Sequence, residues 1–299
     1  MIKKLLITFL FLTISASAFA KEKLIVGTYD SFTTEWGPGL EIEKMFEEIC
    51  ECDLEYIATS QAGTLTNNLF VKNKDVILGV EAHNFDYSTQ DYRVYDYGYF
   101  AFIYNKENLK NPPKTFDELL SRDGVKLIVQ DPRTSPVGLG LLRWMKTIYK
   151  DNFKDAIKTI NKKIITYTPG WSEAYGMFLE EKSDIVLSYS TSPYYHQEYE
   201  NDYRYEALIF EEGHLTTKEI VYVTADSKQK KLGRQFIDFM LDKDVQNIIA
   251  SKNIMYPVSK DKDAMPKKMA KLIKPIEIDY PQLLVAEDLI SEWLKALVE

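Results

Sequence analysis

The chain has 299 residues and a formal net charge of −8, with 45% hydrophobic residues. This length allows two modest domains or one large domain. The acidic balance argues against a nucleic-acid partner, because nucleic-acid binding selects for basic patches. It suits a cationic solute, but charge alone does not identify one.

The first twenty residues have the pattern of a cleavable export signal. Lys3 and Lys4 supply the positive start, residues 5–14 supply the apolar stretch, and residues 18–20 form an A-x-A cleavage site. The apolar stretch is too short to span a membrane, and no lipid-anchor cysteine follows it. We therefore predict cleavage after Ala20 and a soluble mature protein outside the cytoplasm.

Residues 24–80 alternate between strand and helix patterns. This β-α-β-α-β order predicts parallel strands with helices on the faces of an open α/β sheet. The predicted strands are 24–29, 54–58 and 76–80, and the predicted helices are 40–49 and a segment through Leu65, Leu69 and Phe70.

The two cysteines, Cys50 and Cys52, lie at the end of the first predicted helix. In an oxidising compartment they can pair with each other or with another chain, and the short spacing leaves free thiols open as an alternative. The three histidines (His83, His196 and His214) are scattered, so the chain offers no zinc ligand set. We predict that the protein binds no metal.

A second alternating unit follows. Strands 97–104 and 219–224 lie where the chain can cross between the units, which predicts a two-lobed, hinged solute-binding protein. The other predicted strands are 127–130, 164–167 and 184–188, and the predicted helices are 116–120, 141–149, 173–179, 231–241 and 290–297.

Polar loops at the strand ends form the candidate site, because ligands of open α/β sheets bind beyond the carboxyl ends of the strands. Helix N-termini in such loops bind anions, and Arg133 adds positive charge beside one of them. Ordinary capping is the simpler explanation of any single loop. The four residues placed to cap a helix are Thr64, Ser135, Ser172 and Ser192.

Aromatic side chains gather at the same loops. The chain has 20 tyrosines and 4 tryptophans, more than its core needs. Rings beside anion sites suit a ligand with a flat, electron-poor ring and an acidic tail, because ring faces attract cations. Asp30 and Glu173 could balance a positive ring. The aromatic residues concerned are Tyr29, Trp36, Trp171, Tyr189, Tyr194 and Tyr195.

Eight stretches closely resemble the periplasmic thiamine-binding proteins of bacterial thiamine and thiamine pyrophosphate ABC transporters. The likeness runs from about Leu24 to the C-terminus, and several of the motifs are long and distinctive. The stretches are YDSFTTEWGPG (29–39), DYGYFAFIYNKENLKNPP (96–113), QDPRTSPVGLGLL (130–142), GWSEAYGMFL (170–179), DIVLSYSTSPYYH (184–196), EEGH (211–214), MYPV (255–258) and ISEWLKAL (290–297).

This resemblance implies an α/β fold with two lobes, the type II, ferric-binding-protein-like periplasmic binding fold, and a ligand cleft between them. The implied ligand is thiamine, thiamine monophosphate or thiamine pyrophosphate, with no cofactor. The implied partners are an ABC permease of the inner membrane and its ATPase, which places the protein in the periplasm. We predict a first lobe at 21–96 plus about 220–275 and a second at 97–219 plus about 276–299.

The resemblance also assigns ligand contacts. We expect Tyr189 and Tyr195 to face the rings of the ligand and the hydroxyls of residues 190–192 to face its tail. The candidate ligand-binding residues are Tyr29, Asp30, Trp36, Gln61, Ala62, Ser135, Trp171, Tyr189, Ser190, Thr191, Ser192 and Tyr195.

Three departures separate the chain from the family pattern. An acidic residue followed by glycine is replaced by Gln61-Ala62, a tryptophan before MYPV is Ile254, and the segment 80–95 is much shorter than the family's. Specificity would then rest mainly on the second lobe. Weaker binding of thiamine, or a related pyrimidine ligand, are the alternatives that these departures leave open.

Two other functions fit parts of the sequence. Tyr194 and Tyr195 on a strand-to-helix turn resemble the phenolate pair of ferric-binding proteins, although Trp171 would serve no purpose at Fe(III). Thiamine-degrading enzymes can share this fold and use a cysteine nucleophile, but Cys50 and Cys52 follow the first helix, away from any strand-end loop. We predict a binding protein and no catalytic residue.

Overall fold

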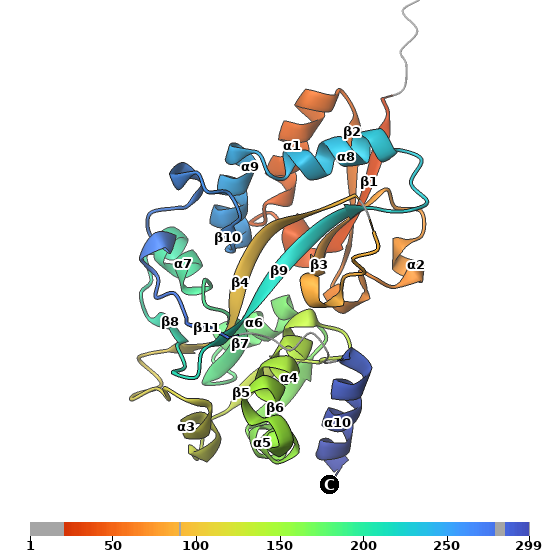
Figure 1. The fold of residues 1–299 in the computed structure, drawn as a ribbon. Coiled ribbons are helices and arrows are strands. Elements are labelled where there is room, and N and C mark those ends of the chain that lie inside the picture. Colours follow the sequence, from red (N-terminus) through yellow and green to blue (C-terminus); the bar gives the residue numbers. More distant parts are fainter. Residues whose placement is uncertain (1–20, 90, 279–284, 299) are drawn as a thin grey trace, which may run out of the picture.

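The computed structural model describes residues 21–89, 91–278 and 285–298. The predicted export signal, residues 1–20, lies outside them. Figure 1 shows two α/β lobes joined by two long strands that run side by side. In the described ranges, no helix combines the length and apolar character needed to cross a membrane.

The first lobe is built on three strands whose parallel pairing confirms the predicted β-α-β-α-β order. β1 lies in the middle and pairs in parallel with β2 on one side and with β3 on the other. The strands are β1 (Lys23–Tyr29), β2 (Asp53–Thr59) and β3 (Val76–Glu81), and the helices packed around them are α1 (Gly39–Cys50), α8 (Lys230–Phe239) and α9 (Lys243–Ile248).

Two long strands connect the lobes, β4 (Tyr92–Asn105) and β9 (His214–Val223). The first half of β4, up to Tyr99, pairs antiparallel with β9, and β9 in turn pairs with β3. From Phe100 onward, β4 pairs instead with β7 (Ile185–Tyr189) of the second lobe. One strand is therefore shared by the sheets of both lobes, and it fixes where the two lobes meet.

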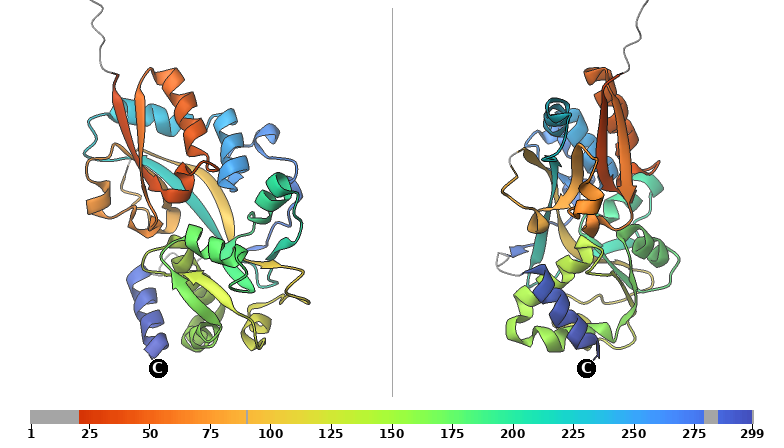
Figure 2. Two further views of the ribbon diagram at one scale, coloured as in Figure 1. Left: turned by 180° about the vertical axis from the view of Figure 1, so that it is seen from behind. Right: turned by 90° about the vertical axis from the view of Figure 1, so that its right-hand side faces the viewer.

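The second lobe repeats the α/β plan. β5 pairs in parallel with both β6 and β7, and α10 packs against α4 and α5, at the end of the molecule opposite α1 (Figure 2). Its elements are β5 (Leu127–Gln130), β6 (Ile164–Thr168), β8 (Tyr205–Leu208), α3 (Phe116–Ser121), α4 (Pro136–Tyr149), α5 (Phe153–Asn161), α6 (Trp171–Leu179) and α10 (Ala286–Val298).

Short elements complete the chain and close the loops. They are η1 (Asp30–Thr33), η2 (Ala62–Thr64), α2 (Asn68–Val71), η3 (Ala82–Asn84), η4 (Lys150–Asn152), α7 (Pro193–Tyr195), η5 (His196–Glu200), η6 (Ile249–Asn253), β10 (Tyr256–Pro257), η7 (Lys262–Ala264), η8 (Met269–Lys271) and β11 (Glu277–Ile278). Several of them stand at the carboxyl ends of the long strands, where the sequence places the candidate site.

Each lobe has its own hydrophobic core. The first core contains Phe46 and Phe236, whose rings pack edge to face at 5.1 Å, together with the apolar faces of β1 and β3. The second centres on Trp144, whose Nε1 donates to the Gly213 carbonyl at 3.0 Å, and it includes Trp293 from α10. The domain boundaries predicted from the sequence stay a prediction.

The structure differs from the prediction between the second and third strands. Instead of one helix through Leu65, it has the 3-10 turn η2 and the single-turn helix α2. Asn67 caps α2 by accepting from the Leu69 N–H, so the prediction that Thr64 caps a helix is wrong. The Thr64 hydroxyl donates to the Gln61 carbonyl instead. Asn67 starts a helix through a hydrogen bond of its own side chain. Apolar spacing does not reveal a helix start of this kind.

The two cysteines form a disulfide, Cys50–Cys52, with Cα atoms 5.1 Å apart. It closes the C-terminal end of α1 where the chain turns into β2. Of the alternatives that the sequence leaves open, the intrachain pair is the one observed.

Gly79 marks the point where β3 meets the ring of Tyr29. Its φ is +92°, a conformation that favours glycine, and the register of β3 against β9 shifts between Leu78 and Val80. A Cβ built on Gly79 would lie 2.2 Å from Cε1 of Tyr29. The position therefore requires glycine for its backbone and for the space that the tyrosine ring fills.

We expect Gly79→Ala to destabilise the protein more than Gly124→Ala does. Both positions have positive φ, but nothing lies within 4 Å of a Cβ at Gly124. Both variants therefore lose stability because alanine disfavours a positive φ. Only Gly79→Ala also loses stability through overpacking against Tyr29, roughly 1–3 kcal/mol. Denaturant unfolding of the two variants measures this difference in stability. Equal losses of stability would show that the Tyr29 ring can move aside without cost.

Candidate functional site

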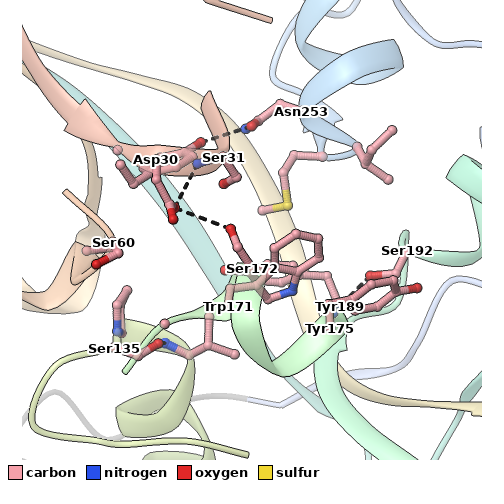
Figure 3. Close-up of a pocket in the computed structure, with 18 of the residues that line it drawn as sticks. Asp30, Ser31, Ser60, Ser135, Trp171, Ser172, Tyr175, Tyr189, Ser192 and Asn253 are labelled. Carbon is pink, nitrogen blue, oxygen red and sulfur yellow. Dashed lines mark hydrogen bonds between the residues drawn. The ribbon is translucent and has the colours of Figure 1, made fainter. Parts of the chain in front are cut away.

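A pocket of about 300 Å³ lies between the two lobes, within the size range of small-molecule sites. Figure 3 shows side chains from both lobes pointing into it. The lining residues that the sequence analysis proposed are Tyr29, Asp30, Trp36, Ala62, Ser135, Trp171, Tyr189, Ser192 and Tyr195.

Helix α6 presents its N-terminus to the pocket. Gly170 is the N-cap and has no side chain to accept from the first-turn N–H groups, so they remain available to an anion. The prediction that Ser172 is the cap is wrong, because the helix already begins at Trp171. Ser172 Oγ instead donates to Asp30 Oδ1 at 3.3 Å, across the pocket from the first lobe (Figure 3). Glu173 is exposed and does not line the pocket.

Trp171 is held in one orientation by two contacts. Its Nε1 donates to Ser188 Oγ at 2.7 Å, and its ring stacks on Tyr175 at 4.8 Å with an interplanar angle of 19°. Trp36 approaches from the first lobe, with ring centroids 6.5 Å apart. The two tryptophans thus present ring surfaces to the same pocket from opposite lobes.

Ser135 caps α4, as predicted from the Ser-Pro sequence. Its Oγ accepts from the Val137 N–H at 3.3 Å, Pro136 occupies the first helical position, and Ser135 is only 3% exposed. Beside it, the Gly63 N–H of the first lobe donates to the Thr134 carbonyl at 2.9 Å. The lobes therefore touch directly at this edge of the pocket.

Arg133 does not supply positive charge to the pocket. Its guanidinium pairs with Asp131 and lies 5.7 Å from the ring of Trp293. It is more than half exposed. The sequence analysis did not consider Asp131, two residues earlier. Its ion pair with Arg133 explains why the guanidinium is not available to the pocket.

The segment from Tyr189 to Tyr195 contributes less than expected. Tyr189, Ser192 and Tyr195 line the pocket, but Ser190 and Thr191 do not. The last two are buried, at 2% and 0% exposure. The expectation that the hydroxyls of residues 190–192 face the tail of the ligand stays a prediction.

Tyr194 and Tyr195 do not converge on a common point in the pocket. Tyr195 lines it, whereas Tyr194 is buried beside Tyr99 and Tyr256. Over the part of the chain that the structure describes, no group of three or more His, Cys, Asp or Glu residues is arranged to hold a metal ion. Fe(III) would require such hard ligands together with both phenolates, so the iron alternative is not favoured.

Two of the three departures from the family pattern reach the pocket. Ala62 lines the pocket, but Gln61 does not. Ile254 lines it at the end of η6 with φ +60°, an unusual conformation for a β-branched residue. The position that the resemblance assigns to a tryptophan thus does face the ligand space.

Sequence reasoning missed an acidic group at the base of the pocket. Glu219 Oε2 accepts from the hydroxyls of Tyr29 at 3.0 Å and Tyr95 at 2.5 Å. Burial raises the pKa of Glu219, and the hydrogen bonds from the two tyrosines oppose that rise. The only signal in the sequence was a carboxylate that opens the predicted strand 219–224. Further lining residues that were missed are Ser31, Ser60, Gly79, Tyr175, Asn253 and Met255.

The sequence comparisons place the chain in a known family. Residues 59–281 match the family model of the bacterial extracellular solute-binding proteins. A thiamine-binding periplasmic protein of Salmonella typhimurium is 41% identical, covering 96% of this chain and 97% of that protein. The thiamine-binding periplasmic protein of Escherichia coli is 40% identical over the same shares.

The solved structures agree with the predicted fold class. A periplasmic thiamin binding protein superposes with a TM-score of 0.86 at 39% identity, covering 93% of this chain and 96% of that one. Iron-bound HitA from Pseudomonas aeruginosa superposes with a TM-score of 0.70 at 18% identity, over 92% and 98% of the two chains. The latter shows the fold alone and confirms the two-lobed, ferric-binding-protein-like architecture. The chain belongs to the bacterial extracellular solute-binding proteins.

Proposed function

We propose that the pocket binds thiamine or one of its phosphate esters and that the protein delivers this ligand to an ABC importer. Two relatives at 40% and 41% identity are named thiamine-binding periplasmic proteins. The observation that carries the proposal is the position of Trp171. It begins α6, so one residue brings an aromatic face and the free N–H groups of a helix N-terminus to the same pocket.

The pocket offers a matching partner for each end of such a ligand. The thiazolium ring is a flat cation, which the faces of Trp36 and Trp171 attract. The phosphate is an anion, which the N-termini of α6 and α4 attract. The Ser135 hydroxyl, which accepts from the Val137 N–H, still has its own proton to donate. Thiamine combines these two requirements in one molecule.

We propose binding without catalysis. Cys50 and Cys52 are joined in a disulfide, and neither lines the pocket. A thiamine-degrading enzyme of the kind considered above needs a free thiolate in contact with the ligand. Incubation with thiamine and an added nucleophile, followed by chromatography, tests this point, and cleaved thiamine would contradict it.

The cellular setting belongs to the same proposal. The pattern of residues 1–20 supports export with cleavage after Ala20, and the relatives are named periplasmic. In that compartment the loaded protein would present both lobes to a permease of the inner membrane, whose ATPase drives uptake. Closure of the lobes around the ligand would mark the loaded form.

Replacing Trp171 tests the aromatic contact. We expect Trp171→Ala to weaken thiamine binding by about 30-fold, because a cation–π contact in a desolvated site contributes about 2 kcal/mol. In the wild type, thiamine should change the tryptophan fluorescence. Trp171→Phe should remove most of that change, whereas Trp293→Phe, on the buried face of α10, should keep it. An unchanged affinity in Trp171→Ala would exclude this residue from the site.

Replacing Ser135 tests the phosphate end. We expect Ser135→Ala to weaken thiamine monophosphate and pyrophosphate by roughly ten- to a hundredfold, the contribution of a hydrogen bond to a charged group. Unphosphorylated thiamine, with a hydroxyethyl tail there, should lose much less. Calorimetric titration of the three ligands measures the difference.

Thr115→Ala is the matched control for Ser135→Ala. Thr115 caps α3 in the same lobe by accepting from the Glu118 N–H at 3.0 Å, and it does not line the pocket. Both variants should lose about 1 kcal/mol of stability as a cap is removed, but only Ser135→Ala should lose phosphate affinity. Equal weakening of all three ligands by Ser135→Ala would show that this serine does not read the phosphate.

A further inference from the structure

Glu219 occupies an unusual position for a carboxyl group. It lines the pocket from β9, the strand that connects the lobes, and its hydrogen-bond partners in the described chain are neutral. These partners are the phenols of Tyr29 and Tyr95 and, at 3.5 Å, the amide of Asn253. The Tyr29 hydroxyl has a second acceptor at the same distance, Asn253 Oδ1 at 3.0 Å, so Tyr95 is the main donor that stabilises the ionised carboxylate. None of these groups carries a positive charge.

A second carboxyl group stands next to it. Asp96 on β4 is directly opposite Glu219 in the antiparallel ladder and is 0% exposed. Its Oδ2 accepts from Asn253 Nδ2 at 2.8 Å, so one amide bridges both acids. Burial raises the pKa of Asp96 well above its usual range, and the charge of Glu219 raises it further. Two adjacent buried carboxyl groups disfavour each other's ionised form, and Glu219 is the member of the pair that lines the pocket.

The remaining charged and titratable groups around the pair leave Glu219 without a cation. On β3, Glu81 faces Glu219 in the ladder, but it is matched by Arg143 at 3.6 Å and by the Thr217 hydroxyl at 2.9 Å. On β7, Tyr189 lines the same pocket, and burial raises the pKa of its phenol well above the usual value. With Tyr29 on β1 and Tyr95 on β4, every neighbour is a neutral phenol, an acid or an already paired base.

We propose that Glu219 recognises the positive charge of the ligand, because it is the carboxyl group of the buried pair that lines the pocket and its hydrogen-bond donors in the described chain are neutral. The proposal rests on the proposed function and extends it, because it names the group that selects a cationic ring over a neutral ring of the same shape. Trp36 and Trp171 attract any flat ring, whereas a carboxylate discriminates by charge.

Proton linkage is the direct consequence. Burial raises the pKa of Glu219 in the free protein, so this carboxyl takes up a proton at a higher pH than an exposed glutamate does. A bound cation favours the ionised form, lowers that pKa and so expels the proton. Affinity for a cationic ligand should therefore rise with pH up to the free-protein pKa and level off above it. A neutral ligand should show no such rise from this group.

The experiment compares thiamine with its thiophene analogue, in which the charged ring is replaced by a neutral one and the aminopyrimidine is kept. Calorimetry of the wild-type protein in two buffers of different ionisation heat, at mildly acidic pH, should show up to one more proton released with thiamine than with the analogue. This measurement needs no variant, so it stands even if a substitution at Glu219 fails to fold.

The variants then assign the charge to one residue. Glu219→Gln should weaken thiamine roughly ten- to a hundredfold at neutral pH, leave the analogue within about threefold and abolish the extra proton. Asp96→Asn, which alters the buried neighbour that does not line the pocket, should keep thiamine affinity within about threefold. Glu206→Gln is the matched control, because Glu206 also accepts from a tyrosine hydroxyl, that of Tyr104 at 3.0 Å, but does not line the pocket.

The possible failures can be told apart. A wild type that binds neither compound overturns the proposed function, and this inference with it. A wild type that binds thiamine but releases no extra proton at any pH, or a folded Glu219→Gln that weakens both compounds equally, overturns the inference alone. In the latter case Glu219 only shapes the pocket through Tyr29 and Tyr95.

Discussion

The hydrogen-bonded run of β4 through both lobes is the constraint on which the rest of the molecule depends. Up to Tyr99 this strand pairs with β9, and from Phe100 it pairs with β7. The change of partner holds the carboxyl end of β7 next to the pocket and sets Glu219 of β9 at the pocket base. Each lobe keeps its own hydrophobic core, so the contacts within either core do not depend on how the two lobes are placed.

The pocket follows from this geometry. The parallel strands of an open α/β sheet end at one edge, and two such edges face each other here. Helix N-termini, serine hydroxyls and aromatic rings therefore meet in one place, although they come from different elements. Direct contacts between lobes, from Gly63 to Thr134 and from Ser172 to Asp30, frame the same space. A ligand that touches both sides would add its own contacts to these and stabilise the closed arrangement.

Much of the fold was predictable because the apolar spacing of strands and helices is local. β1, β3 and β5 lie within a residue of their predicted bounds, and the parallel order of the first lobe follows from alternation alone. The single-turn α2 was not predictable, since Asn67 caps it through a side chain that apolar periodicity does not weigh. Helices α5 and α9 were also missed. Local sequence patterns predict such helices poorly when tertiary packing determines whether they form.

The site divides in the same way. Ser135 and Trp171 were predictable because cap chemistry and the motif around them are contiguous in the sequence. Ser190 and Thr191 are buried outside the pocket lining, although the same motif contains lining residues, because burial of a side chain depends on neighbouring elements and not on the local sequence alone. Glu219 was missed because its role arises from Tyr29, Tyr95 and Asp96, residues brought together only by the sheet.

Calorimetric titration of the protein with thiamine tests the central claim most directly. One saturable site per chain, tighter for thiamine than for its thiophene analogue, is the result that this account predicts. Absence of heat and of binding by equilibrium dialysis would contradict it. So would a visible phenolate-to-iron charge-transfer band with Fe(III) in place of thiamine binding, because it would assign the pocket to a metal rather than to a cationic ring.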